Sequence, residues 1–145
     1  MTKKTIPTGF TFEQLSLGQA AEARHEVSDE TIRRFAEVSG DNNPIHLDAD
    51  YAATTRFGKR IAHGMLAASY ISAMIGTTLP GPGAIYMGQT LKFRAPVRIG
   101  DSVTVRVEVT ALNAEKKRVT LATVCRVGDT VVVEGEALIM VPSGA

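Results

Sequence analysis

The clearest pattern along the chain is an alternation of apolar and polar residues in its C-terminal half. Between residues 102 and 110 every second residue is a valine, and the residues between them are polar or charged. A second alternating face follows at 119–127, and the segment 130–140 is rich in valine and isoleucine. A period of two with β-branched residues is typical of half-buried strands. Polar turns at 113–117 and 128–129 separate the three segments, which predicts antiparallel pairing.

Two further strands are expected upstream. Ile85, Met87, Leu91 and Phe93 share one parity, which predicts a single strand over 84–94. With the three segments above, it would form a four-stranded antiparallel meander, and a strand at 21–27 would be the fifth.

Helical signals are confined to the first half of the chain. Ser28 can cap a helix whose first turn holds two acidic residues and which Gly40 ends. Asp48 can cap a short helix that runs through Ala52.

A third helix is predicted from His63 to about Gly76, and no charged residue occurs between Ile61 and Leu91. A helix without a polar face is expected to be buried on most sides. The pattern therefore predicts an α+β fold in which an antiparallel sheet wraps around one buried helix. Its exposed sheet edge and apolar helix favour a dimer.

Composition narrows the function classes. The 145 residues suit one domain, 1–145. Sixteen Lys and Arg against fifteen Asp and Glu give a net charge of +1, without the basic excess that nucleic acid or an anionic membrane surface requires. The most apolar stretch, 65–75, is too short for a transmembrane helix of about 20 residues.

The cysteine content and the N-terminus indicate the compartment. Cys125 is the single cysteine and cannot form an internal disulfide. Residues 1–7 hold two lysines but no apolar run follows them, so no signal peptide is evident. A cytoplasmic protein is expected.

The segment Gly-Asp-Asn-Asn-Pro-Ile-His-Leu-Asp at 40–48 carries candidate chemistry. Pro44 disfavours helical geometry at Asn43, which predicts an extended loop. The loop brings Asp41 and His46 together, and a carboxylate and an imidazole can hold and activate a water molecule between them. In the alternative interpretation, Asp41 caps a turn and His46 packs beside Leu47.

The start of the third helix offers a second feature. The backbone N–H of Gly64 lies at the positive end of the helix dipole, where it could stabilise negative charge on a carbonyl oxygen. Alternatively, Gly64 only lets the helix approach the sheet closely. His63 is expected to hydrogen-bond the loop rather than to catalyse. Ser69 and Ser72 could bond to carbonyls of their own helix, or Ser72 could face a ligand or position His46.

Several segments together resemble the MaoC-like (R)-specific enoyl-CoA hydratases. These segments are Ser39–Asp48, Tyr51–Gly58, Arg60–Leu66, Leu79–Gly83, Gln89–Phe93 and Pro96–Asp101. The resemblance covers about residues 28–142, and it is strongest to the short members with a single hot-dog domain that supply monomers for polyhydroxyalkanoate synthesis. It implies a hot-dog fold, a homodimer with the active site at or near the subunit interface, and hydration of a trans-2-enoyl-CoA to an (R)-3-hydroxyacyl-CoA.

The resemblance also assigns residues. Asp41 and His46 match the catalytic pair, and Gly64 matches the residue whose N–H contacts the thioester carbonyl. Ser72 matches a polar position beside the acyl pocket, which Ile75 and Ile139 would narrow. Two stiff isoleucines there predict a preference for short acyl chains, of about four to six carbons.

The resemblance implies no metal and no redox cofactor, because coenzyme A arrives as part of the substrate. Its phosphates could meet one of several basic residues, namely Arg56, Lys59, Arg60, Arg94 and Arg98.

Two other functions fit the same fold. A hot-dog thioesterase would hydrolyse the same acyl-CoA, but its water-activating carboxylate does not need this Asp–His pair. A non-catalytic dimer that binds acyl-CoA would not need the pair either.

Overall fold

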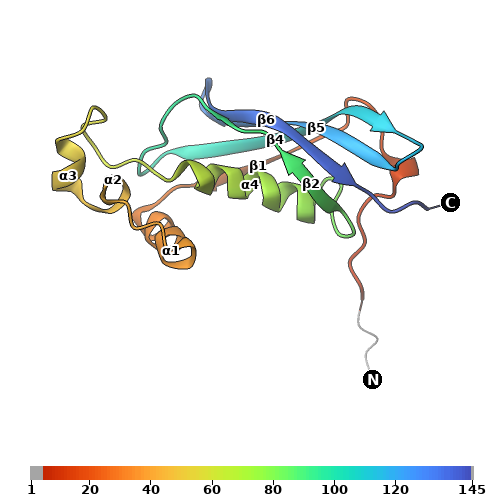
Figure 1. The fold of residues 1–145 in the computed structure, drawn as a ribbon, viewed down its shortest axis with the longest axis horizontal. Helices are drawn as coiled ribbons and strands as arrows, with labels where there is room; N and C mark the ends of the chain where they lie inside the picture. The colour runs from red at the N-terminus through yellow and green to blue at the C-terminus, as the bar shows by residue number, and fades with distance from the viewer. Residues whose placement is uncertain (1–4, 145) are drawn as a thin grey trace.

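The computed structural model describes residues 5–144 as one antiparallel sheet packed on a long helix (Figure 1). Residues 1–4 and 145 lie outside the described part, and with them the start of the segment considered for a signal peptide. The six strands of the sheet are β1 (Ala20–Glu26), β2 (Ile85–Gln89), β3 (Lys92–Phe93), β4 (Ser102–Asn113), β5 (Arg118–Val127) and β6 (Thr130–Met140). The helices are the 3-10 helix η1 (Phe12–Gln14) and α1 (Asp29–Ser39), α2 (Pro44–Leu47), α3 (Ala49–Ala53) and α4 (Gly64–Thr77).

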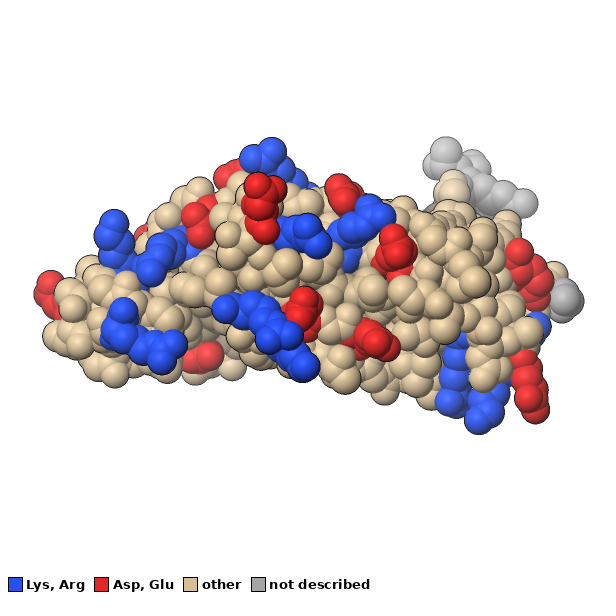
Figure 2. All heavy atoms as spheres, turned by 90° about the horizontal axis from the view of Figure 1, so that it is seen from above, with Lys and Arg blue, Asp and Glu red and all other residues tan. Residues whose placement is uncertain are grey.

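The core lies between α4 and the inner face of the sheet. The alternating residues of β4 and β5 face it as expected, and all of them except Val127 are fully buried or nearly so. The outer face carries interspersed charges of both signs (Figure 2), such as Arg106 with Glu22 and Glu108. The α+β hot-dog fold expected from the sequence is confirmed. None of the described helices is long and apolar enough to cross a membrane.

Helix α4 has one buried face and one exposed face. Leu66, Ile71 and Ile75 pack on the sheet, whereas Met65 and Ser72 are exposed. The expectation that this helix is buried on most sides is therefore not met within the single described chain, because only one layer of sheet packs against it.

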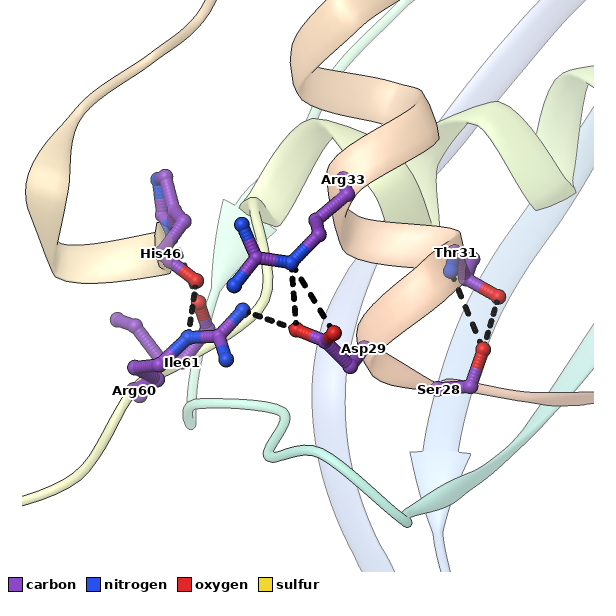
Figure 3. Close-up of polar contacts among 7 residues, drawn as sticks. All are labelled: Ser28, Asp29, Thr31, Arg33, His46, Arg60 and Ile61. Carbon is purple, nitrogen blue, oxygen red and sulfur yellow. Dashed lines mark hydrogen bonds and ion pairs between the residues drawn. The ribbon is translucent and has the colours of Figure 1, made fainter. Parts of the chain in front are cut away.

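The helix caps expected at Ser28 and Asp48 are present. The Ser28 hydroxyl accepts a hydrogen bond from the Thr31 N–H at 3.1 Å (Figure 3), and Gly40 ends α1 with a positive φ of 78°. The Asp48 carboxylate accepts from the N–H groups of Asp50 and Tyr51, which starts α3. In Figure 1 the helices α1, α2 and α3 gather at one end of the sheet, beside the N-terminus of α4.

The prediction of an extended loop at 40–48 is wrong, because a short helix, α2, forms inside it. Asn43 itself is not helical, with ψ of 124°, as expected for a residue before proline. Its side chain caps the helix by accepting from the Ile45 N–H, and Pro44 occupies the first helical position, where its missing N–H costs nothing.

The prediction of one strand over 84–94 is also wrong. Its register on β6 shifts between Tyr86 and Gly88, and the segment divides into β2 and β3. Thr90, between the two strands, makes two hydrogen bonds to Glu136 of β6. Its N–H donates to the Glu136 carbonyl oxygen, and its hydroxyl accepts from the Glu136 N–H.

The strand order differs from a sequential meander. The order is β1-β4-β5-β6-β2, so β2 lies beside β6 rather than beside β4. Both edges of β4 are already paired, one with β5 and the other with β1 over seven residues, so β2 cannot pair with β4.

Candidate active site

Three segments that are separate in the sequence bring their polar side chains together at the N-terminus of α4. Asp41 comes from the turn after α1, His46 from α2, and His63 from the residue that precedes α4. One donor atom of each, a carboxylate oxygen or a ring nitrogen, lies within 4.8 Å of the others. The two histidines are buried and Asp41 is exposed. The pair expected from the sequence, Asp41 and His46, therefore shares one site.

The orientation of the His46 ring is set by a backbone carbonyl. Its Nδ1 lies 2.8 Å from the Ile61 oxygen (Figure 3). Because a carbonyl oxygen can only accept, Nδ1 must carry the proton and donate. In the neutral ring, Nε2 is then the nitrogen with the free lone pair.

His63 supports both members of this pair. Its Nε2 donates to the backbone oxygen of Asp41 at 3.0 Å, and its ring stacks on His46 with centroids 3.9 Å apart. The Phe35 ring packs against its ring at 4.8 Å. This confirms the expectation that His63 hydrogen-bonds the loop. Its Nδ1 is buried and has no hydrogen-bond partner among residues 5–144.

The Asp41 carboxylate also organises its own turn. Its Oδ1 accepts from the Asn43 N–H at 3.2 Å, and the Asp41 N–H donates to the Ser39 hydroxyl. The turn-capping role considered for Asp41 is therefore real. This role uses Oδ1 and does not involve Oδ2.

Burial decides the charge of His46. Loss of solvation lowers the pKa of the His46 ring, and His63 lowers this pKa further, while the hydrogen bond to Ile61 and the Asp41 carboxylate oppose the shift. The pKa stays below its ordinary value, so the ring is neutral at pH 7. A neutral imidazole with a free Nε2 can accept a proton.

The same three side chains could hold a metal ion by residue type, but their arrangement does not favour one. An imidazole nitrogen binds a metal along its lone pair, which lies in the plane of the ring. The rings of His46 and His63 are stacked, with only 29° between their planes, so their lone pairs do not converge on one point. The cluster fits acid–base chemistry better than a tetrahedral metal site.

Gly64 and a pocket lie beside this cluster. The pocket has a volume of about 460 Å³, and Gly64 and His63 line it together with Phe93, Arg56 and Arg94. Gly64 is the first residue of α4, so its N–H has no partner within the helix. A Cβ atom on Gly64 would lie 2.7 Å from the Phe93 ring. This contact supports the close-approach interpretation of Gly64, which is also one of the residues that line the pocket.

Comparison with known proteins identifies the family. A family model described as MaoC like domain matches residues 13–134. The chain belongs to the MaoC-like domain family.

Relatives with named activities resemble most of this MaoC-like chain. An (R)-specific enoyl-CoA hydratase from Rhodospirillum rubrum is 57% identical over 132 residues, which cover 91% of this chain and 92% of that protein. A 3-hydroxybutyryl-CoA dehydratase from Methylorubrum extorquens is 56% identical, with 90% of this chain and 83% of that protein covered. Among solved structures, the unliganded R-hydratase PhaJ1 from Pseudomonas aeruginosa superposes with a TM-score of 0.88 at 49% identity, covering 93% of this chain and 87% of that one.

Other residues expected at the site lie elsewhere in the described MaoC-like chain. Ser72 is eight residues beyond Gly64 on α4, or about 12 Å along the helix axis. It is exposed, and its side chain makes no hydrogen bond within residues 5–144, whereas Ser69 donates to the Leu66 carbonyl. Ile75 and Ile139 are 1% and 0% exposed and belong to the core. The single chain does not bring these three residues to the Gly64 pocket.

Arg60 has a different place from the one expected. The sequence makes Arg60 a candidate to contact the phosphates of coenzyme A, but its side chain is only 12% exposed and forms an ion pair with Asp29. Its Nε donates to the backbone oxygen of His46 at 2.7 Å. Sequence reasoning missed this contact and the Ile61 carbonyl, because neither follows from a motif or a periodicity.

Proposed function

We propose that this protein catalyses the reversible hydration of a trans-2-enoyl-CoA to the (R)-3-hydroxyacyl-CoA. The observation that carries the proposal is the juxtaposition of Asp41 with a buried, neutral His46 whose Nε2 is free. The Gly64 N–H beside the adjoining pocket supports it. The names of the two relatives at 56–57% identity support the same substrate class.

The mechanism follows from these groups. A water molecule held between the Asp41 carboxylate and Nε2 of His46 gives its oxygen to C3 of the substrate. One proton of this water passes to the pair, and a proton from the pair goes to C2 on the same face. The two groups titrate as one coupled unit, so the acid and base roles belong to the pair and not to either residue alone.

Gly64 would stabilise the charge that develops during this addition. Attack at C3 moves electron density onto the thioester oxygen, and the unpaired N–H at the start of α4 can donate to it. Such a donor costs no reorganisation, because the helix holds it in place.

We propose coenzyme A as the carrier of the acyl group. Arg56 and Arg94 line the pocket and can reach an anionic ligand at its mouth, although Arg94 also pairs with Glu134. Ser72, Ile75 and Ile139 are assigned to the acyl pocket by resemblance alone. The cytoplasmic location expected from the sequence stays a prediction.

We propose that the working unit is a homodimer joined at the β2 edge. Strand β2 is the last strand of the sheet, and its apolar residues are exposed, Ile85 at 54% and Met87 at 44%. Phe93 and Met65 extend this apolar surface toward the Gly64 pocket. A second copy would cover both the free strand edge and the apolar side chains. Light scattering should give twice the chain mass, and Met87→Lys should shift it toward the monomer. A monomeric wild-type protein at micromolar concentration would contradict the dimer.

The experiment for the activity follows crotonyl-CoA by its enoyl-thioester absorbance while free thiol is measured in parallel. Hydration consumes the double bond without release of coenzyme A, and chiral chromatography should identify the (R) product. Rapid thiol release would instead establish a thioesterase. Absence of any turnover with tight binding would establish an acyl-CoA-binding protein.

The same assay tests the catalytic pair. Asp41→Asn and His46→Gln should each lower kcat by at least ~10²-fold, the usual scale for a positioned acid or base. Asp50→Asn and His25→Gln are matched controls, because they make the same chemical changes outside the site. Asp50 is exposed on α3, and His25 stacks on Tyr70, whereas His46 stacks on His63. Turnover near the wild-type rate in Asp41→Asn or His46→Gln would remove that residue from the mechanism.

A further inference from the structure

His46 is held at both of its ends by two consecutive residues. The Ile61 carbonyl accepts from the ring Nδ1 at 2.8 Å, and the Arg60 Nε donates to the backbone oxygen at 2.7 Å (Figure 3). Helix α2 has only four residues, and the last carbonyls of a helix have no partner of their own. Arg60 therefore supplies a hydrogen bond that α2 cannot make for itself.

Arg60 is in turn held by α1. Its Nη2 donates to Oδ1 of Asp29 at 2.6 Å, and Asp29 is the first residue of that helix. The Arg33 Nε reaches both carboxylate oxygens of Asp29, at 3.1 and 3.0 Å. Arg60 lowers the pKa of the Asp29 carboxyl, with a smaller contribution from Arg33, so the carboxylate keeps its charge at neutral pH. Figure 3 shows this chain of contacts from α1 through Arg60 to His46.

The shape of the guanidinium group matters here. Its planar fork donates from Nε to one acceptor and from Nη2 to another, in fixed relative directions. The two acceptors lie on different helices, His46 on α2 and Asp29 on α1. A lysine has a single nitrogen at the end of a flexible chain and cannot hold both acceptors with the same geometry.

We propose that Arg60 is a positioning residue, which uses Asp29 as its support to hold α2 so that the His46 ring keeps its bond to Ile61 and directs Nε2 toward Asp41. This inference rests on the proposed function for its catalytic consequence, since His46 is the proposed acid–base group. The contact chain Asp29–Arg60–His46 is called the clamp below.

The clamp predicts an effect on turnover rather than on substrate binding. Arg60 lies behind His46, on the side of its backbone, and it does not line the Gly64 pocket. A misplacement of about 1 Å at a catalytic group can cost 10²-fold in rate. Arg60→Gln should therefore lower kcat by roughly 10- to 100-fold, while KM for crotonyl-CoA changes by less than about threefold because the pocket is intact. Arg60→Lys should recover only part of the loss.

Two arginines of α1 provide matched controls. Arg33→Gln removes the other cation on Asp29 but no contact to His46, and Arg34→Gln removes the exposed ion pair with Glu30. Both should keep kcat within about twofold of the wild type, since neither donates to α2. A loss in Arg33→Gln as large as that in Arg60→Gln would overturn the clamp, because it would trace the effect to α1 as a whole.

A second readout does not depend on activity. Nitrogen-15 NMR of the histidine side chains reports which ring nitrogen carries the proton. Wild-type His46 should show the Nδ1–H tautomer that the Ile61 bond selects, and Arg60→Gln should show a mixture of both tautomers. An unchanged His46 tautomer in a folded Arg60→Gln protein would overturn the proposal, as would a kcat within twofold of the wild type.

A second variant and the tautomer measurement test the role of Arg60 even if Arg60→Gln does not fold or the protein has no hydratase activity. If Arg60→Gln does not fold, Asp29→Asn replaces it, because this change weakens the support of Arg60 without removing a donor to His46. It should also produce the tautomer mixture and a lower kcat, and the absence of both would overturn the clamp. If the wild-type protein does not hydrate crotonyl-CoA, the proposed function fails, and the tautomer measurement still decides whether Arg60 orients His46.

Discussion

Replacing Gly64 by alanine tests whether the start of α4 takes part in catalysis. The added Cβ would lie 2.7 Å from both Cδ1 and Cε1 of Phe93, so the ring must retreat by roughly 0.7 Å to reach the 3.4 Å of ordinary contact. Phe93 is half-exposed on the short strand β3, so its ring can turn aside. An off-rotamer side chain costs about 0.5–1.5 kcal/mol. For a chain of this size, this lowers Tm by about 2–6 °C.

The expected effect on catalysis is much larger than this effect on stability. The methyl group and the displaced ring would crowd the N–H that the thioester oxygen is proposed to reach. Loss of one such donor costs about 10²–10³-fold in kcat. Gly64→Ala should therefore lose activity on this scale in the crotonyl-CoA assay, while circular dichroism shows a folded protein with a Tm only a few degrees lower.

Two further variants separate the causes. Gly76→Ala adds a methyl group to the same helix where nothing lies within 4 Å of the new Cβ, so it should keep its activity. Adding Phe93→Ala to Gly64→Ala removes the clash and should restore part of the rate, which a double-mutant cycle would measure. If Gly64→Ala keeps kcat/KM within threefold of the wild type, the Gly64 N–H has no role in stabilising the thioester oxygen.

Three other outcomes are expected, two from the structure and one from the resemblance. Burial lowers the pKa of His46 and of His25 below the ordinary 6.5, so the unfolded chain binds more protons than the folded one as the pH falls through this range. The free energy of unfolding, measured in urea, should therefore decrease from about pH 7.5 to pH 5.5, and it should decrease less steeply in His46→Gln. An equally steep decrease in that variant would contradict the pKa shift at His46. Burial raises the pKa of the Cys125 thiol to about 12, so an aromatic disulfide reagent should modify Cys125 only after unfolding, and fast modification of the native protein would contradict its burial. The acyl-pocket role that the resemblance assigns to Ile75 and Ile139, which lie in the core of the single chain, predicts that Ile75→Val and Ile139→Val raise kcat/KM for octenoyl-CoA relative to crotonyl-CoA. A constant ratio with a loss of about 0.5–1.5 kcal/mol in stability would show that the two isoleucines only pack the core.

The sequence predicts which residues face the core better than it predicts which strands are neighbours. The alternation at 102–127 names the buried side chains of β4 and β5 correctly, because a period of two follows from strand geometry alone. Strand order is a property of the whole sheet. The pairing of β2 with β6 depends on β1 already occupying the edge of β4, and no local pattern reports that.

The candidate site shows the same division. The motif around Asp41 and His46 and the position of Gly64 are visible in the sequence, because these residue types in this order are specific. The contact of Arg60 with Asp29 and His46 joins residues 31 and 14 positions apart through the packing of α1 against α2. From the sequence alone, Arg60 therefore looks like an ordinary surface cation, and only the fold shows its contacts. Likewise, Pro44 in the sequence suggests a loop, and only the folded structure shows that it is the first residue of α2.

The free edge of β2 has a consequence for the behaviour of the separated chain. A strand edge with exposed apolar residues is a template for irregular pairing with other chains. Strands β2 and β3 together hold one charged residue, Lys92, next to the exposed Phe93. Lysine on an edge strand opposes unwanted pairing, because joining a further strand would desolvate its charge. Replacing Lys92 would thus leave the native fold intact and yet make the protein more prone to precipitate on dilution or gentle heating.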